Sequence, residues 1–302
     1  MSPDDFVLAL RALDAPVFLD DHGIPSLLGV EFTATTSDGR NVLVTQLSPA
    51  LNGQVTDPDA FVRTIERGGY QGAGITESGQ LYFLELPPRG VSLAQRLATA
   101  GPVPASELLA IARATTDALA GAPPHGAITP ATVYVAGDGS VSLRWPAMAL
   151  ALRAAGVDVA TLATALDAAL YLAPEVLGGG PFDTRTDIFA LGVTLYTALT
   201  GRPPFGGRTT ATMMAVVLAD DGAPATSATG LLTAALLRAF EQEPADRWRD
   251  MEQFRDALAP PRAGAPRLPA EPASAARRGC AGTAGIFIGG GLVLWAVAQY
   301  IS

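Results

Sequence analysis

The apolar pattern changes its period about a third of the way along the chain, and this change constrains the fold more than any other feature. Before Leu93 the sequence predicts strands and tight turns, and from Leu93 onward the period is helical. A Ser-Asp-Gly turn at residues 37–39 indicates a hairpin. The expected strands are residues 30–34, 42–47 and 81–86, with one helix at 58–67. The pattern therefore predicts an α+β fold, with a small β-rich part before a larger helical part.

In the helical part, the most apolar segment is residues 187–200. It is hydrophobic nearly all round, so we expect it to be the central buried helix, capped by Asp187 and ended by Gly201. A second hairpin is expected at residues 133–143, where Gly-Asp-Gly joins two short strands. The other expected helices are residues 106–119, 209–220, 228–240 and 250–258.

Composition excludes several kinds of chemistry. The 302 residues carry a net charge of −9, and all 20 basic residues are arginine. Without lysine the chain can form no Schiff base and has no phosphate-holding lysine of the P-loop type. The acidic charge argues against nucleic acid as a partner. Two histidines and one cysteine, Cys280, show no metal-site spacing, and a lone cysteine excludes an internal disulfide and fits a reducing compartment.

The segments before and after the main domain differ from it in character. Residues 1–16 lack a secretory signal and are expected to form a short helix with Phe6, Leu10 and Leu13 on one face. Residues 260–278 are rich in proline and alanine, which indicates an extended linker.

Residues 279–302 are expected to form one transmembrane helix. From Gly279 to Ile301 there is no charge, and about 21 residues at roughly 1.5 Å each span roughly 30 Å, the thickness of a bilayer core. Arg277 and Arg278 precede this run, so the positive-inside rule predicts a single pass through the inner membrane with the main domain in the cytoplasm. The alternative is a buried helix of a soluble fold.

Small residues recur at every fourth position of this C-terminal segment. Ala281, Gly285 and Gly289 would form a smooth stripe on which two membrane helices could pack, so a homodimer is expected. The alternative is that the glycines only mark a poorly packed chain end.

Three motifs in the helical part resemble those of one protein family. They are Ala-Pro-Glu at 173–175, Asp-Ile-Phe-Ala-Leu-Gly at 187–192 and Glu-Pro-Ala-Asp-Arg at 243–247. In this order and spacing they resemble motifs of the bacterial, eukaryotic-like Ser/Thr protein kinases. The resemblance runs from about Val17 to Leu258. It implies a two-lobed protein kinase-like fold at residues 17–259, with an N-lobe at about 17–88 and a C-lobe at about 91–259.

The sequence departs from this family at the positions that carry phosphotransfer. Protein kinases use a strand lysine, a catalytic-loop aspartate and asparagine, and a metal-binding aspartate. The residues at those positions are Thr45, Ala127, Thr132 and Trp145, and the glycine-rich loop is reduced to Gly29. The resemblance therefore implies no kinase activity and no bound ATP or magnesium. Trp145 either fills the former nucleotide site or packs on the hairpin.

The other kinase-like residues are expected to have structural roles. Glu175 and Arg247 are expected to form a largely buried ion pair between the activation segment and a late helix. By resemblance, Asp187 accepts amide hydrogen bonds from the former catalytic loop, and His125 braces that loop. Glu66 is a candidate acidic partner from the N-lobe helix, although there is no lysine for it to meet.

The sequence thus leads to a membrane-anchored pseudokinase that acts as a signalling scaffold or allosteric regulator. Its partner would be an unidentified cytoplasmic protein, such as an active kinase. The alternative is a divergent Ser/Thr protein kinase, or another ATP-dependent enzyme, with a non-standard active site. A purely structural anchor is the third hypothesis.

Overall fold

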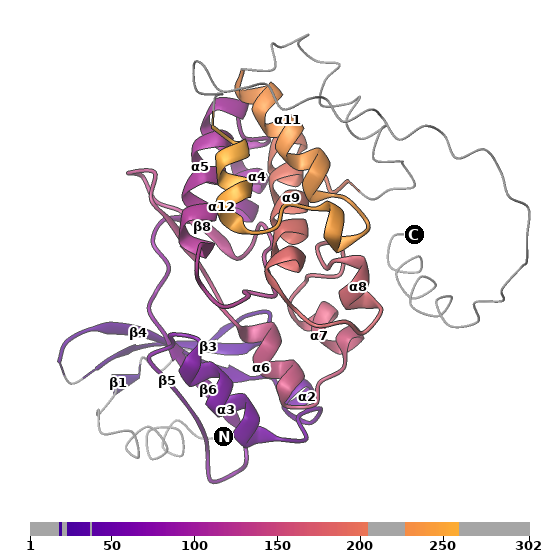
Figure 1. The fold of residues 1–302 in the computed structure, drawn as a ribbon. Helices are drawn as coiled ribbons and strands as arrows, with labels where there is room; N and C mark the ends of the chain where they lie inside the picture. Colours follow the sequence, from indigo (N-terminus) through magenta and orange to yellow (C-terminus); the bar gives the residue numbers. More distant parts are fainter. Residues whose placement is uncertain (1–17, 20–22, 37, 205–226, 260–302) are drawn as a thin grey trace, which may run out of the picture. The chain divides into compact units, whose positions relative to one another are not determined.

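The computed structural model describes residues 18–19, 23–36, 38–204 and 227–259, all within one compact unit (Figure 1). The predicted helices at 1–16 and 209–220, the linker at 260–278 and the transmembrane helix at 279–302 lie outside the described residues. Within the described ranges, the helices are too short or too polar to cross a bilayer.

The N-lobe is built on an antiparallel sheet. Its strands lie in the order β1-β3-β4-β6-β5, and β2 also pairs with β3. They are β1 (Phe18–Leu19), β2 (Ile24–Pro25), β3 (Gly29–Thr35), β4 (Asn41–Leu47), β5 (Gly72–Ile75) and β6 (Leu81–Glu85). β3 and β4 form the predicted hairpin, with Thr35 opposite Asn41 beside the turn. The predicted strands at 30–34, 42–47 and 81–86 are confirmed to within a residue at each end.

Helix α3 (Pro58–Arg67) packs on one face of this sheet and follows the single turn α2 (Pro49–Asn52). The side chain of Asp57 accepts a hydrogen bond from the backbone N–H of Ala60 at 2.9 Å, which caps the helix. Phe61 and Ile65 lie one turn apart and are fully buried, so they fix the face of α3 that meets the sheet. The predicted helix at 58–67 is confirmed.

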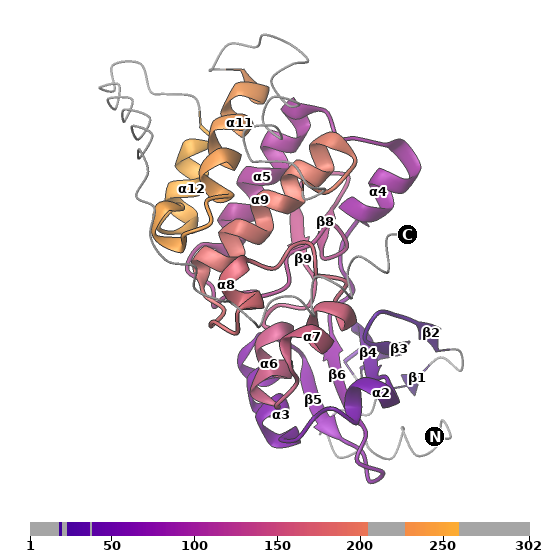
Figure 2. The same ribbon diagram turned by 90° about the vertical axis from the view of Figure 1, so that its right-hand side faces the viewer.

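The C-lobe is mainly helical, with a small sheet in the order β7-β8-β9. Helices α5, α9, α11 and α12 lie side by side in both views (Figures 1 and 2). The C-lobe strands are β7 (Val91–Ser92), β8 (Val133–Val135) and β9 (Val141–Leu143). Its helices are α4 (Leu93–Ala100), α5 (Ala105–Leu119), α6 (Met148–Ala154), α7 (Val159–Ala165), α8 (Pro174–Leu177), α9 (Thr184–Thr200), α11 (Ala228–Ala239) and α12 (Met251–Ala257).

Helix α9 is the central helix, buried from Thr186 to Ala198, as its all-round apolar pattern predicts. Its cap is not the predicted Asp187. Asp183 caps it instead, through a reciprocal capping box with Thr186. The helix therefore begins one turn earlier than expected, and the carboxylate of Asp187 is free to act elsewhere.

Helix α6 was not expected from the sequence, and it packs against α3 of the N-lobe. The carbonyl of Ala155 accepts hydrogen bonds from the backbone N–H groups of Thr56 and Asp57, at 2.8 and 3.1 Å. Met148 and Leu152 are fully buried on α6. The segment after β9 therefore joins the two lobes instead of running as an open loop.

Candidate functional site

The loop between α5 and β8 corresponds to the catalytic loop implied by the resemblance. At its start, Asp187 of α9 accepts hydrogen bonds from the backbone N–H groups of His125 and Gly126, at 2.6 and 2.8 Å. Burial raises the pKa of Asp187 to about 7, although these two N–H groups act in the opposite direction. The carboxylate of Asp187 thus attaches the loop to the central helix.

The imidazole of His125 supports the same loop from within. Its Nδ1 accepts a hydrogen bond from the backbone N–H of Ala127 at 3.2 Å, and only 2% of the residue is exposed. Burial lowers the pKa of His125 to about 4, opposed by the carbonyl of Arg144, so the ring is neutral near pH 7. His125 therefore holds the turn of the loop.

Hydrogen bonds within the loop hold two of the phosphotransfer positions. The hydroxyl of Thr132 donates to the carbonyl of Ala127 at 2.9 Å and accepts from the backbone N–H of Thr129 at 2.9 Å. Both Ala127 and Thr132 are 1% exposed. Ala127 offers only a methyl group, and the Thr132 hydroxyl is already engaged, so neither is arranged to act on a substrate.

Thr45 lies fully buried on β4, directly opposite Glu31 on β3 and Phe83 on β6. Directly opposed residues point to the same face of a sheet, so Glu31 and Thr45 are neighbours. In the described part of the chain, the Thr45 hydroxyl has no hydrogen-bond partner. The position that resembles the kinase lysine site is thus a small buried side chain beside a carboxylate.

An ion cluster that the sequence did not predict joins this sheet to the end of β9. The Arg144 guanidinium lies 2.7 Å from a carboxylate oxygen of Glu31 and 2.7 Å from one of Glu85. The indole N–H of Trp145 donates to the same Glu85 oxygen at 3.2 Å, and the guanidinium carbon stands 4.8 Å from the Trp145 ring centroid. Glu31 neighbours Thr45, so the cluster links the position of the kinase lysine with that of the metal-binding aspartate.

The cluster is enclosed, and its charges shift one another. The side chains of Arg144 and Glu85 are 11% and 8% exposed. Burial raises the pKa of Glu85, and Arg144 opposes this rise. Burial lowers the pKa of Arg144, but Glu85 and Glu31 together outweigh it and raise that pKa above its usual value. Both carboxylates share one cation, so with all three groups ionised the cluster has one negative charge in excess.

A tight turn stands where the resemblance places the glycine-rich loop. The backbone N–H of Ser26 donates to the carbonyl of Gly29 at 2.8 Å. A Cβ on Gly29 would lie 2.0 Å from the carbonyl oxygen of Gln46, so only glycine fits. The chain closes at once onto β4 and forms no open phosphate-binding loop.

These residues do not fit magnesium-bound ATP, the cofactor that the fold implies. Phosphate binding needs cations and metal binding needs oxygen ligands, whereas the side chains present are Thr45, Trp145 and two carboxylates already paired with Arg144. In the described ranges, His, Cys, Asp and Glu form no group that could hold a metal ion. A cavity of about 390 Å³ borders this region. His125 and Pro146 help to line it, but neither Thr45 nor Trp145 does.

The Glu66 carboxylate does not enter this region. Glu66 is exposed on α3, whereas Phe61 and Ile65 of the same helix turn towards the sheet. The suggestion that Glu66 supplies an acidic partner to the Thr45 position is therefore wrong for this structure, because its side chain lies on the solvent side of α3.

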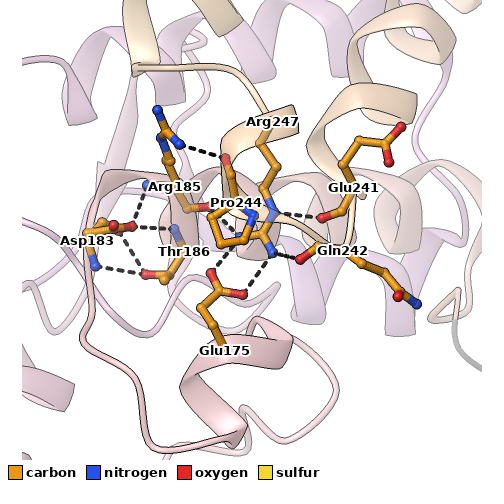
Figure 3. A network of polar contacts seen from close by, with 8 residues as sticks. All are labelled: Glu175, Asp183, Arg185, Thr186, Glu241, Gln242, Pro244 and Arg247. Carbon is orange, nitrogen blue, oxygen red and sulfur yellow. Dashed lines mark hydrogen bonds and ion pairs between the residues drawn. The ribbon is translucent and has the colours of Figure 1, made fainter. Parts of the chain in front are cut away.

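Glu175 and Arg247 form the centre of a second polar network, drawn in Figure 3. Arg247 donates through Nη1 and Nη2 to the two oxygens of Glu175, at 2.6 and 2.8 Å. Its other bonds go to the carbonyls of Arg185, Glu241 and Gln242. The Arg247 side chain is 0% exposed and that of Glu175 23%. The network ties α8 to the loop before α12 and to the start of α9.

Comparison with known proteins agrees with this architecture. Residues 155–239 match the family model of the protein kinase domain. The kinase domain of Mycobacterium tuberculosis PknI superposes with a TM-score of 0.62 and 22% identity, covering 82% of this chain and 95% of that one. At that identity the likeness shows the fold, which is a protein kinase fold with a β-sheet N-lobe and a helical C-lobe.

Curated relatives extend the comparison from the fold to the amino-acid sequence. The Ser/Thr protein kinase PknB of Mycolicibacterium smegmatis is 29% identical over 215 residues, which are 68% of this chain and 34% of the relative. PknL of Mycobacterium tuberculosis is 31% identical over 205 residues, 62% of this chain and 51% of the relative. The chain thus spans a third to a half of these proteins. Together the findings support a relationship to the bacterial Ser/Thr protein kinases.

Proposed function

We propose that this chain is a kinase-like binding module that transfers no phosphate and regulates another signalling protein. The observation that carries the proposal is the state of the four phosphotransfer positions. Thr45 and Ala127 are buried without charge, the Thr132 hydroxyl bonds within its own loop, and Trp145 bonds to Glu85. Catalysis of phosphoryl transfer depends mostly on charged groups held in position. The side chains at these four positions carry no charge, so they cannot supply this effect.

Retention of the architecture supports a binding role. The Arg247 network and the attachment of the loop to Asp187 maintain the C-lobe without any contribution from the four positions. Such a module can present surfaces to a cytoplasmic protein, such as an active kinase. We further propose that residues 279–302 anchor the module to the inner membrane as a single helix, with the main domain in the cytoplasm.

A second candidate is a divergent Ser/Thr protein kinase, and the comparisons favour it over a pseudokinase. The curated relatives at 28–31% identity are all Ser/Thr protein kinases by name. In that case Arg144 and its two carboxylates would have to rearrange before a nucleotide could bind. Binding of ATP that depends on magnesium would be the signature of this second function.

The two functions are separated by incubating the full chain with labelled ATP and magnesium or manganese. We expect no incorporation above a heat-denatured sample, and no shift of the melting temperature with ATP. Ala127→Asp should not restore transfer, because the other three groups are still missing. Incorporation that is lost in Thr45→Ala but kept in Thr99→Ala, a matched change at an exposed threonine on α4, would establish the divergent kinase instead.

A further inference from the structure

The N-lobe sheet has two apolar faces, and each is formed by alternate residues. On β4 and β6 the odd-numbered Leu47, Leu81 and Phe83 belong to the main core, together with Phe61 and Ile65 of α3. The even-numbered side chains point the other way, as successive residues of a strand must. We call the face of these even-numbered side chains the outer face. It comprises Ala34, Val42, Val44, Tyr82 and Leu84.

The outer face is buried as completely as the core. Val42 is 1% exposed, Val44 0% and Leu84 4%. Their pairing places them side by side: Ala34 lies opposite Val42, and Val44 lies opposite Leu84. A sheet face cannot remove itself from water, so an apolar face this dry requires another layer on top of it.

No described helix supplies that layer. The residues that form the outer-face cluster all come from strands β3, β4 and β6, with Phe32 at its margin. The one described helix that packs broadly on the sheet, α3, lies on the opposite face through Phe61 and Ile65. The covering layer must therefore come from residues beyond the described ranges.

We propose that the N-terminal segment, residues 1–17, docks on the outer face as a helix. It leads directly into β1, where Phe18 pairs with Thr35 and Leu19 with Ala34, so it enters the lobe at the edge of this face. A helix from Pro3 to Leu13 would be about 16 Å long, enough to cross three neighbouring strands roughly 4.8 Å apart.

The sequence of the segment has the matching chemistry. Phe6, Leu10 and Leu13 lie on one side of such a helix, and Arg11 lies on the opposite side. The other undescribed segments are less well placed: residues 205–226 are held at both ends by the C-lobe helices α9 and α11, and residues 260–302 follow α12. The N-terminal segment would thus complete the N-lobe, and a partner could reach the outer face only by displacing it.

The test places a thiol on the outer face of the full chain. In a Cys280→Ser background, Val44→Cys is treated with a maleimide and the labelling rate is measured. With Leu10→Asp and Leu13→Asp added, the thiol should react at least ten times faster, because two carboxylates prevent docking. With Arg11→Asp instead, the rate should stay as slow as in the parent.

A second thiol, Leu236→Cys in the same background, detects general unfolding. Leu236 is fully buried on α11, and its labelling should stay slow in every variant. Unchanged protection of position 44 in the double aspartate variant would overturn the proposal. Protection lost on dilution would show a second copy on this face, and protection lost only when residues 260–302 are removed would show the C-terminal segment there; both also overturn it. Labelling that rises at both thiols in the double variant would mean global loss of structure, and would likewise count against a local covering layer.

Discussion

Replacing Arg247 with alanine should destabilise the fold more than any single surface change. The Arg247 side chain is fully buried and all three of its nitrogens donate hydrogen bonds. Nη1 and Nη2 each donate to Glu175 and to one backbone carbonyl, and Nε donates to a third carbonyl. Its guanidinium also lies 4.9 Å from the ring centroid of Phe189. Arg247→Ala removes these contacts together and leaves a cavity in the C-lobe.

The expected loss of unfolding free energy depends on the charged partner that stays in the protein. Breaking a buried ion pair by removing one partner costs about 3–5 kcal/mol, because the other charge loses its compensation. The remaining Glu175 side chain is 23% exposed and can recover part of its hydration. Glu175→Ala leaves the fully buried cation of Arg247 with carbonyl partners only. We therefore expect losses of about 3 kcal/mol or more for each variant.

Urea denaturation of the full chain measures these losses. Arg255→Ala is the matched control, because Arg255 pairs with Asp117 at the surface and its side chain is 39% exposed. Exposed pairs contribute about 0–1 kcal/mol, so this midpoint should barely move. If Arg247→Ala cost no more than Arg255→Ala, the reasoning from burial would be refuted.

Two further predictions concern pH and the C-terminal segment. Burial raises the pKa of Asp187 to about 7, so the contribution of Asp187 to stability falls as pH rises from about 4 to 7. Burial lowers the pKa of His125 to about 4, so the contribution of His125 to stability grows as pH rises from about 4 to 6.5. Asp187→Asn should therefore leave a stability that rises with pH over this window, and His125→Asn one that falls; parallel slopes in thermal melts would contradict the assignment. In the proposed membrane helix, Gly285→Ile or Gly289→Ile should abolish crosslinking between copies, while Gly291→Ile, on the other side of the helix, should not; equal crosslinking in all three would rule out the stripe as an interface.

The elements that could be predicted from sequence are those with local signals. Helix α3 is one of them, because Asp57 and Pro58 mark its start and Gly68 its end. The start of α9 is ambiguous in the sequence, because Asp183 and Asp187 are equally good caps by residue type. Only the structure shows that the carboxylate of Asp187 bonds to the backbone of residues 125 and 126.

The ion cluster could not be predicted, because its members are far apart in the chain. Arg144 and Glu85 are 59 positions apart and lie in different lobes, and nothing in the local pattern pairs them. Helix α6 was missed for a different reason. Its residues, Met-Ala-Leu-Ala-Leu-Arg-Ala, are strong helix formers followed by Gly156, but a run of seven is too short to show a helical period.

The packing of α6 on α3 has a consequence for how the molecule opens locally. The carbonyl of Ala155 holds the backbone N–H groups of Thr56 and Asp57, so the end of one helix and the start of the other share the same bonds. A Cβ on Gly156 would lie 2.0 Å from the hydroxyl of Thr56, which leaves no room for the two ends to slide. Amide protons of α3 and α6 should therefore exchange with solvent as one group, with a common opening free energy. This is expected even though residues 68–147 separate the two helices in the chain. A protein that grips α6 would thereby slow exchange in α3, and its binding could be read out in the N-lobe without touching it.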